Sequence, residues 1–246
     1  MKVALAGGTR GIGRALARLL VERGHQVFLL GRDGEQLVRS VADLRARGAV
    51  PAGEGWAPLD LLAPAGFAAA LDAADAALDG FDALVVTAAD FDRQEALEAD
   101  PERLRRLLEA DFTGTVLLCE HARKRLLQRG GGTLCVFGSV AGDRGRKPVV
   151  LYGAAKAGLA RYLEGLDHRY HGAGLRVVTV KPGFVRTGMT QGLPEPPFAA
   201  DAEPVARRAV AALERGTPMV YAPWIWRWIM LVIRLLPRAV MRRVGF

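Results

Sequence analysis

A cluster of glycines near the N-terminus constrains the fold of this chain more than any other feature. Residues 7–13, with the sequence GGTRGIG, contain four glycines. A short apolar segment at residues 2–6 precedes them, and apolar residues at helical spacing follow as far as Gly24. A strand, a glycine-rich turn and a helix in this order are typical of a unit that binds a dinucleotide.

Each glycine of this turn has a role in such a unit. Gly7 permits a tight turn, Gly11 lets the backbone approach a pyrophosphate, and Gly13 lets the helix pack closely on the sheet. The positive end of the helix then faces the negative charge. We therefore expect cofactor contacts from six residues of the turn: Gly7, Thr9, Arg10, Gly11, Ile12 and Gly13.

Apolar segments and helical patterns alternate along the rest of the chain. The expected strands lie near residues 2–6, 26–30, 56–59, 83–87, 133–138, 176–181 and 219–222. The expected helices lie near residues 11–23, 33–47, 64–78, 101–129, 151–172 and 202–215. This alternation predicts an α/β fold, a single Rossmann-fold domain with a doubly wound parallel sheet of about seven strands and helices on both faces. Ligands of such a sheet bind at the carboxyl ends of its strands.

A tyrosine and a lysine four residues apart give the strongest chemical signal. Tyr152 and Lys156 share one face of a predicted helix, and an ammonium beside a phenol lowers the pKa of the phenol from ~10. Ser139 follows a predicted buried strand, where its hydroxyl can hydrogen-bond a carbonyl oxygen while the tyrosine protonates it. The tyrosine–lysine spacing alone is weak because chance matches are common, but the glycine turn strengthens it.

Together these motifs resemble the short-chain dehydrogenases/reductases. The glycine spacing GxxxGxG, Asp60, Ser139, Tyr152, Lys156 and residues 182–187 (PGFVRT) carry the resemblance, which covers nearly the whole chain. It implies an NAD(P)-dependent enzyme in which Tyr152 donates a proton, Ser139 orients the carbonyl, and Lys156 lowers the tyrosine pKa and binds the nicotinamide ribose. It also implies cofactor contacts from Asp60, Leu61, Tyr152, Lys156, Pro182, Gly183, Val185 and Thr187. Asp60 has a second interpretation, as the cap of the helix expected from residue 64.

Two arginines predict which cofactor is preferred. The second expected strand ends at Gly31 and Arg32, where an acidic residue would bind the ribose hydroxyls of NAD. Arg10 and Arg32 instead suit the 2′-phosphate of NADP. NADP(H) is therefore the expected cofactor, with NAD(H) as the alternative. A competing interpretation is that Arg32 pairs with Asp33 or Glu35 on the surface.

The chain departs from the family pattern at three places. Ala6 replaces the usual threonine before the first glycine, and residues 87–90 (TAAD) stand where the family usually has NNAG. Asp111 replaces an asparagine that, in the family, helps to hold a water linking the lysine to solvent. A carboxylate accepts the same hydrogen bonds and attracts the ammonium of Lys156, so Asp111 is a candidate catalytic residue. The alternative is a helix-interior acid that pairs locally.

Composition indicates a reducing compartment and no metal site. Cys119 and Cys135 lie in separate apolar segments, which indicates buried thiols rather than a disulfide framework. The first strand begins at Lys2, so we expect no signal peptide and a cytoplasmic location, either free or peripheral on the inner face of the membrane. The four histidines have no metal-ligand spacing.

The C-terminal segment differs from the rest of the chain. Residues 216–246 contain five arginines and no acidic residue, in a chain whose net charge is +8. One helical stripe is apolar and consists of Trp224, Trp228, Leu231 and Leu235. A second stripe is basic and consists of Arg227, Arg234, Arg238 and Arg242. The pattern predicts a basic amphipathic helical tail, residues 224–246, after a catalytic domain at residues 1–223.

A long apolar face beside arginines suits a membrane interface. The tail is unsuited to spanning a bilayer, because Arg227, Arg234 and Pro237 interrupt a run already near the lower limit of ~17 residues. The alternative is packing, either in a homo-oligomer interface or as a flap over the core of the domain. Nucleic acid binding is disfavoured because the basic residues are interleaved with a broad apolar face.

The tail, with residues 139–146 (SVAGDRGR) and 152–159 (YGAAKAGL), also resembles one subgroup, the decaprenylphosphoryl-2-keto-ribose reductases. This resemblance implies a keto-pentose on a polyprenyl phosphate as the substrate, and a helix lying on the membrane suits a substrate of that kind. Arg144, Arg146 and Lys147 flank the expected pocket mouth, either to meet a phosphate or as solvated loop charges.

Three functions remain open at this point. The first is reduction of a lipid-linked keto-sugar or another lipidic ketone. The second is a soluble ketoreductase or alcohol dehydrogenase of small substrates, in which the tail only mediates oligomerisation. The third is a nucleotide-sensing protein without turnover, and the intact set of Ser139, Tyr152 and Lys156 argues against it.

Overall fold

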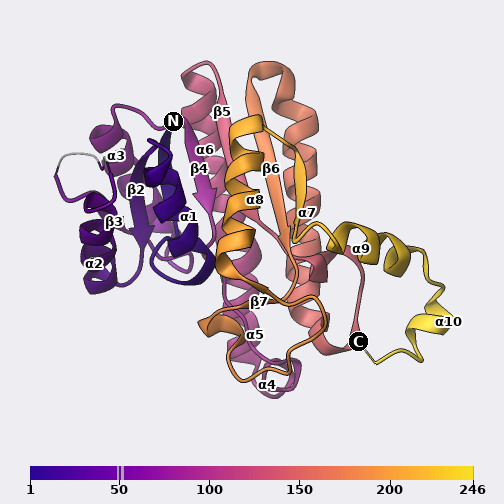
Figure 1. The fold of residues 1–246 in the computed structure, drawn as a ribbon. Coiled ribbons are helices and arrows are strands. Elements are labelled where there is room, and N and C mark those ends of the chain that lie inside the picture. The colour runs from indigo at the N-terminus through magenta and orange to yellow at the C-terminus, as the bar shows by residue number, and fades with distance from the viewer. Residues whose placement is uncertain (49, 51–52, 246) are drawn as a thin grey trace.

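A parallel β-sheet of seven strands forms the centre of the protein (Figure 1). The computed structural model describes residues 1–48, 50 and 53–245; residues 49, 51 and 52 of the expected catalytic domain, and Phe246 of the expected tail, lie outside the described residues. The strand order is β3-β2-β1-β4-β5-β6-β9 with every neighbouring pair parallel. The strands are β1 (Lys2–Ala6), β2 (Gln26–Gly31), β3 (Trp56–Pro58), β4 (Ala83–Val86), β5 (Gly132–Phe137), β6 (Leu175–Pro182) and β9 (Met219–Ala222). This order confirms the predicted doubly wound α/β fold.

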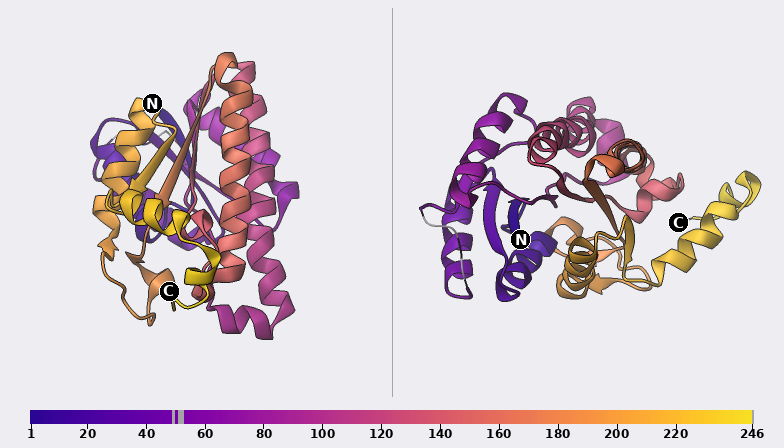
Figure 2. Two further views of the ribbon diagram at one scale, coloured as in Figure 1. Left: turned by 90° about the vertical axis from the view of Figure 1, so that its right-hand side faces the viewer. Right: turned by 90° about the horizontal axis from the view of Figure 1, so that it is seen from above.

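Helices cover both faces of the sheet, as the two views of Figure 2 show. One face carries α1 (Gly11–Glu22), α2 (Gly34–Arg45) and α8 (Ala202–Arg215). The other carries α3 (Phe67–Leu78), α6 (Thr115–Gln128) and α7 (Val150–Tyr170). Because both faces are covered, the central strands are apolar throughout instead of alternating. In β4 and from Val3 to the end of β1, no residue is more than 1% exposed.

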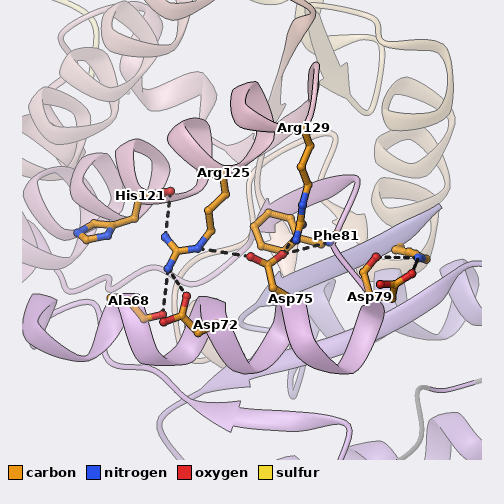
Figure 3. A network of polar contacts seen from close by, with 9 residues as sticks. Ala68, Asp72, Asp75, Asp79, Phe81, His121, Arg125 and Arg129 are labelled. Atoms are coloured by element: carbon orange, nitrogen blue, oxygen red, sulfur yellow. Dashed lines mark hydrogen bonds and ion pairs between the residues drawn. The ribbon is translucent and has the colours of Figure 1, made fainter.

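An ion-pair network joins two of these helices (Figure 3). The guanidinium of Arg125 on α6 contacts the carboxylates of Asp72 and Asp75 on α3. It also donates a hydrogen bond to the Ala68 carbonyl oxygen at 3.2 Å. Arg129, at the end of α6, pairs with Asp75 as well. Each of these two cations therefore has a carboxylate partner, which is the usual arrangement for a partly buried arginine.

The single helix expected at residues 101–129 is divided in three. A π-helical segment, η2 (Glu109–Gly114), joins α5 (Pro101–Leu108) to α6. Such segments occur frequently at functional sites. A Cβ on Gly114 would lie 2.0 Å from the Leu61 carbonyl oxygen, so the glycine lets η2 approach the chain that follows β3. Helical periodicity did not predict this interruption.

Three short elements lie beyond the carboxyl ends of the strands, at the lower edge of the sheet in Figure 1. They are α4 (Gln94–Ala99), β7 (Val185–Arg186) and β8 (Ala200–Asp201), and the sequence did not predict them. β7 pairs with β8, and the two strands enclose the segment 188–199. Arg186 pairs with Glu195 and Asp201, so this loop is tied to the strand that precedes it.

The C-terminal tail is two helices, not the one that the sequence predicts. α9 (Trp226–Leu235) and α10 (Arg238–Met241) are separated at Leu236 and Pro237. In Figures 1 and 2 they project beyond the edge of the sheet next to β9. Of the helices in the described residues, none combines the length and the apolar character that crossing a membrane requires.

α9 presents three different faces. Its inner face, Trp226, Met230 and Ile233, is buried against Val140 and Tyr221 of the domain. Its outer apolar face is between 47% and 77% exposed and consists of Trp224, which precedes the helix, Trp228, Leu231, Val232 and Leu235. Its arginines, Arg227 and Arg234, are also exposed. The apolar stripe read from the sequence is therefore the outer surface of the helix, and a different set of residues attaches it to the domain.

Candidate active site

The glycine turn after β1 presents backbone rather than side chains at the edge of the sheet. Gly7 and Gly11 have φ angles of 95° and 49°, in the left-handed region that favours glycine. A Cβ on Gly13 would lie 2.1 Å from the Gly7 carbonyl oxygen, so a side chain here would force α1 away from the strand. Two further residues of the turn are fixed by contacts with the domain. The Thr9 carbonyl oxygen accepts a hydrogen bond from the Arg14 side chain at 2.8 Å. Ile12 packs on the hydrophobic core.

The N-terminus of α1 is open to an anion. Arg10 is its N-cap residue, and in the part of the chain that the structure describes the Arg10 side chain makes no capping hydrogen bond to the helix. Uncapped N–H groups at the positive end of a helix favour a phosphate. A Cβ on Gly11 would lie 3.2 Å from Thr187 Cγ2, so Thr187 approaches the turn from the opposite side. The glycine turn and the segment after β6 thus form the two sides of the expected cofactor site.

The two arginines expected at the cofactor phosphate have different partners. Arg10 Nη2 lies 3.4 Å from Asp33 Oδ2, with the arginine side chain 73% exposed, and such an exposed pair contributes little. Arg32 is exposed and, in the part of the chain that the structure describes, has no carboxylate within 4.0 Å. Glu35 pairs with Arg39. The competing interpretation, in which Arg32 pairs with Asp33 or Glu35, is therefore not what the structure contains.

Asp60 shapes the turn after β3. Its Oδ1 accepts a hydrogen bond from the Leu62 N–H at 3.0 Å, and a 3₁₀ turn, η1 (Pro64–Gly66), lies between it and α3. Leu61 is only 6% exposed. Asp60 closes a local turn and is not the cap of the following helix, because the N-cap residues of η1 and α3 are Ala63 and Gly66. Contact of Asp60 and Leu61 with adenine stays a prediction.

Ser139 interacts with Tyr152, and Gly142 lets the two segments that carry them pack closely. Ser139 follows β5, and its Oγ accepts a hydrogen bond from the Ala141 N–H at 3.1 Å at the start of η3 (Val140–Asp143). A Cβ on Gly142 would lie 2.7 Å from the Lys156 backbone of α7. The ring of Tyr152, in the first turn of α7, also packs edge-on against Phe91 with centroids 5.1 Å apart.

Lys156 lies one helical turn after Tyr152 and is buried. Its Nζ is 5.5 Å from the centre of the Tyr152 ring and 3.1 Å from Asp111 Oδ2. The Lys156 side chain is 2% exposed and that of Asp111 0%. Asp111 Oδ1 accepts a hydrogen bond from the Asp90 N–H at 2.6 Å. Asp111 is thus in contact with the candidate lysine, and its two partners, Lys156 and Asp90, come from distant parts of the sequence.

Burial and charge have opposite effects on Tyr152. Burial raises the pKa of Tyr152 above its ordinary value; the Lys156 ammonium lowers it, the Asp111 carboxylate raises it, and a hydrogen bond with Ser139 lowers it. The net direction is upward. Lys156 has the effect that the sequence predicts, but burial outweighs it. Tyr152 is therefore a neutral phenol near neutral pH, the form that donates a proton.

The charge of Lys156 is stabilised in the site. Burial lowers the pKa of Lys156, but the Asp111 carboxylate and Tyr152 raise it further than burial lowers it. Burial also raises the pKa of Asp111, against the effects of Lys156 and of the Asp90 N–H. A buried ammonium therefore faces both the phenol and a carboxylate.

A comparison with known families identifies this arrangement. The model of a family described as short chain dehydrogenase matches residues 2–197. The chain belongs to the short-chain dehydrogenase family. The match confirms the family resemblance that the glycine turn and the serine–tyrosine–lysine set indicated. It does not reach the tail, which begins at residue 224, and it does not distinguish a subgroup.

Relatives of this short-chain dehydrogenase cover nearly its whole length. An uncharacterised oxidoreductase of Mycobacterium tuberculosis is 35% identical over 242 residues, which are 98% of this chain and 96% of the relative. Cis-4-hydroxycyclohexanecarboxylate dehydrogenase of Sinomonas cyclohexanicum is 32% identical over 210 residues, 83% of this chain and 82% of the relative. A short-chain dehydrogenase from Sphingobium yanoikuyae, solved in complex with NADPH, has a TM-score of 0.81 at 24% identity and covers 99% of this chain and 96% of its own. At that identity, the last match shows the fold alone.

As a short-chain dehydrogenase, the protein is an oxidoreductase that acts on a carbonyl or an alcohol. This confirms the prediction of an enzyme. The residues present fit the NAD(P)H cofactor typical of the family, because the side-chain-free turn from Gly7 to Gly13 and the uncapped start of α1 suit a pyrophosphate.

Trp226 of this short-chain dehydrogenase is a neighbour of the site that the sequence did not predict. The segment after β6 includes Pro182 and Gly183, and a Cβ on Gly183 would lie 1.9 Å from Trp226 Nε1. Trp226 is 7% exposed, and its indole nitrogen has no hydrogen-bond partner among the described residues. The helical spacing of Trp226, Met230 and Ile233 was the signal that could have found it. Val185, in the same segment, is 5% exposed.

A second buried ion pair lies beside the segment that begins at Ser139. Lys181 Nζ, near the end of β6, is 2.6 Å from Asp143 Oδ1, and the Tyr221 hydroxyl donates a hydrogen bond to Asp143 Oδ2 at 2.7 Å. The sequence did not reveal this cluster because its members lie on η3, β6 and β9. It ties the loop after Ser139 to the strand that leads into the tail.

The three cations that follow Asp143 have different environments. Arg144 Nη2 donates a hydrogen bond to the Leu236 carbonyl oxygen at 2.8 Å, which attaches this loop to the end of α9. Lys147 is exposed. The Nε of Arg146 is buried without a hydrogen-bond partner, and burial lowers the pKa of Arg146. Within the described residues Arg146 has no carboxylate within 4.0 Å, in contrast to Arg125 (Figure 3).

Proposed function

We propose that this enzyme reduces a ketone carried on a lipid to an alcohol at a membrane surface, with NADPH as the preferred cofactor. In its most specific form, the proposed substrate is a keto-pentose on a polyprenyl phosphate. One observation carries the proposal: α9 has both a buried and an exposed apolar face. Trp226 packs on Gly183 beside the candidate site, while Trp228 and Leu235 are 53% and 77% exposed. The helix that packs beside the candidate site thus also carries exposed apolar side chains on its outer face.

The reacting groups suit carbonyl reduction. When bound, NADPH supplies the hydride. The Tyr152 phenol, neutral because burial raises its pKa, donates its proton to the carbonyl oxygen as the hydride arrives. Ser139 hydrogen-bonds that oxygen and orients it. Lys156 stabilises the phenolate left behind and binds the nicotinamide ribose, and Asp111 keeps Lys156 charged and in position. The reverse reaction uses the same groups.

The exposed faces of α9 support the lipid part of the proposal. Apolar side chains in contact with water are unfavourable by roughly 25 cal/mol per Å² of apolar area, and five of them lie together on one surface. The arginines beside them favour an anionic surface. At a bilayer interface the apolar side chains would be removed from water and the arginines would meet the anionic surface, with the helix lying in the plane of the interface.

Arg146 supports an acidic group on the substrate. A guanidinium without a carboxylate partner is rarely buried, yet the Nε of Arg146 is buried and unpartnered. Asp143, whose charge acts on Arg146, is already occupied by Lys181 and Tyr221. A phosphate next to the keto-sugar would provide the missing charge and accept hydrogen bonds from this side chain.

The test compares one ketone in two forms. NADPH oxidation is measured with the keto-pentose on polyprenyl phosphate in micelles and with the same keto-pentose carrying a methyl group instead. We expect a kcat/KM at least ~100-fold higher for the phosphate-linked form, because phosphate contacts and apolar burial each contribute more than ~1.5 kcal/mol. Equal values for the two forms would contradict the proposal. The variant Arg146→Gln should lower kcat/KM about tenfold for the phosphate-linked form only, with Lys147→Gln as the matched control.

A second candidate function keeps the same carbonyl reduction but gives the tail a different role, in which it contacts another subunit. The outer face of α9 could also bury itself against another copy of the chain, in an oligomeric reductase of small ketones. Sedimentation velocity distinguishes this function. A dimer that becomes a monomer on combining Trp228→Ser with Leu235→Ser, without a change in the preference between the two substrate forms, would favour it.

A further inference from the structure

A groove on the outer side of β9 lies between α8 and α9. Its volume is about 290 Å³. Three arginines line it, Arg208 and Arg215 from α8 and Arg227 from α9, together with Trp224 and Trp228. No acidic side chain of the described residues lines it. The groove is therefore a basic hollow edged by aromatic rings.

The charges in this groove are not compensated by the protein. In the residues that the structure describes, none of the three arginines has a carboxylate within 4.0 Å. Arg208 is fixed by a hydrogen bond from its Nε to the Tyr221 carbonyl oxygen at 2.9 Å. The guanidinium of Arg227 lies 5.8 Å from the centre of the Trp228 ring. Glu214, next to Arg215 in sequence, instead faces Arg23 and His25.

Simple structural roles account for only part of this arrangement. A cation in the last turn of a helix is favourable because of the helix dipole, which explains Arg215 at the end of α8. It does not explain why arginines from α8 and α9 line one hollow, since their like charges repel each other. An anion between them removes this repulsion, and planar guanidinium groups match the oxygens of a phosphate.

The size and position of the groove indicate the source of the phosphate. Ligand pockets usually measure about 300–1,000 Å³, so this groove suits a headgroup and not a whole lipid. Trp224 and Trp228 are 56% and 53% exposed at its edge, and the outer apolar face continues from them along α9 to Leu235. Tryptophans lie at the headgroup level of a membrane, which places the arginines beside the phosphates.

We propose that this groove binds the headgroup phosphate of an anionic membrane lipid and so holds α9 in the plane of the interface. The inference rests on the proposed membrane-surface function and adds a defined lipid site to it. The site is distinct from Arg146, which we assign to the substrate. The bound lipid is a component of the membrane and is not consumed.

The experiment measures binding of the full-length enzyme to vesicles by co-sedimentation, without NADPH or ketone. One vesicle preparation contains phosphatidylcholine alone and the other an equal mixture with phosphatidylglycerol. We expect binding only to the mixture. Combining Arg215→Gln with Arg227→Gln should weaken it about tenfold more than the matched control, Arg242→Gln with Arg243→Gln, because a bound phosphate contributes more than the ~1 kcal/mol per cation of general surface attraction.

Three outcomes would overturn the lipid site. Equal losses in the two double variants would show that only net charge matters. Binding of soluble glycerol phosphate to the wild type but not to the groove variant, without a loss of vesicle binding in that variant, would show a site for free phosphate. No vesicle binding by the wild type, with loss of a dimer in the groove variant, would show a subunit contact. Vesicle binding and the reaction are measured separately, so an enzyme that binds vesicles but does not prefer the lipid-linked ketone contradicts the proposed function and leaves the groove intact.

Discussion

Asp111 and Lys156 form an ion pair, with 3.1 Å between Oδ2 and Nζ and neither side chain more than 2% exposed. Removal of one partner from a buried pair costs about 3–5 kcal/mol, because it leaves the other charge uncompensated. The same lysine lies against Tyr152. A change at Asp111 therefore alters both the stability of the site and the charge that the phenol experiences.

We predict that Asp111→Asn keeps substantial activity and that Asp111→Leu loses most of it. Asparagine retains an oxygen that can accept the Asp90 N–H bond, whereas leucine leaves that N–H and the Lys156 ammonium without a partner. The loss for leucine should exceed tenfold in kcat/KM, since ~1.4 kcal/mol corresponds to a factor of ten. Steady-state kinetics of the two variants at equal folded fraction test this, and equal activity for wild type and Asp111→Leu would remove Asp111 from the catalytic group.

The pH dependence of the same Asn variant tests the electrostatic role of Asp111. Reduction needs the protonated phenol, so its kcat/KM falls as the pH rises through the pKa of Tyr152. The Asp111 carboxylate raises that pKa. Asp111→Asn removes the negative charge, lowers the pKa of Tyr152, and should move the alkaline limb of the reduction profile to lower pH.

Alcohol oxidation provides the matching measurement. It needs the phenolate, so oxidation by Asp111→Asn should rise at a lower pH than oxidation by the wild type. The exposed substitution Glu109→Gln, in the same π-helical segment, is the control because its side chain pairs with Arg105 away from the site. An unchanged profile in Asp111→Asn would show that the carboxylate does not act on Tyr152.

The parts of this site that sequence predicted are those in which one local pattern determines the geometry. The turn from Gly7 to Gly13 requires left-handed φ angles and close approach, which only glycine permits. Tyr152 and Lys156 share a helix face through their spacing alone. The sheet follows from alternating apolar strands and helices. The glycine turn and the tyrosine–lysine pair are each encoded in a short segment, the sheet follows from the alternation along the chain, and all three are found where they were expected.

The parts that sequence missed depend on contacts between distant segments. The π-helical turn that carries Asp111 was not expected, because such a turn has no hydrophobic period of its own, although Asp111 itself was expected to attract Lys156. Trp226 reaches Gly183 only because β9 adds to the sheet next to β6. The net pKa shift of Tyr152 depends on burial, which residue spacing does not contain. A periodic pattern identifies the face of a helix but not what that face meets.

Gly183→Ala should separate the tail from the site. The added Cβ would lie 1.9 Å from Trp226 Nε1, so the indole, and α9 with it, must move. We expect a loss of about 1–3 kcal/mol in the free energy of unfolding together with lower kcat/KM. The control is Gly165→Ala in α7, where a Cβ meets nothing within 4 Å and should stabilise the helix by about 0.5–1 kcal/mol. No change in the free energy of unfolding or in kcat/KM for Gly183→Ala would show that α9 is not held against this segment.

Arg32→Gln tests the basis of cofactor preference. Arg32 is exposed at the end of β2 and, among the described residues, has no carboxylate within 4.0 Å, so its guanidinium is free to meet a 2′-phosphate. A hydrogen bond to a charged group contributes about 1.5–3 kcal/mol. We therefore expect KM for NADPH to rise at least about tenfold, while KM for NADH, which lacks that phosphate, stays the same. Arg39→Gln on α2 removes the same charge from a side chain that pairs with Glu35 and should change neither KM. Equal rises in KM for both cofactors after Arg32→Gln would show that Arg32 supports the turn without contacting the phosphate. A wild-type preference for NADH at equal concentrations would contradict the assignment of NADPH.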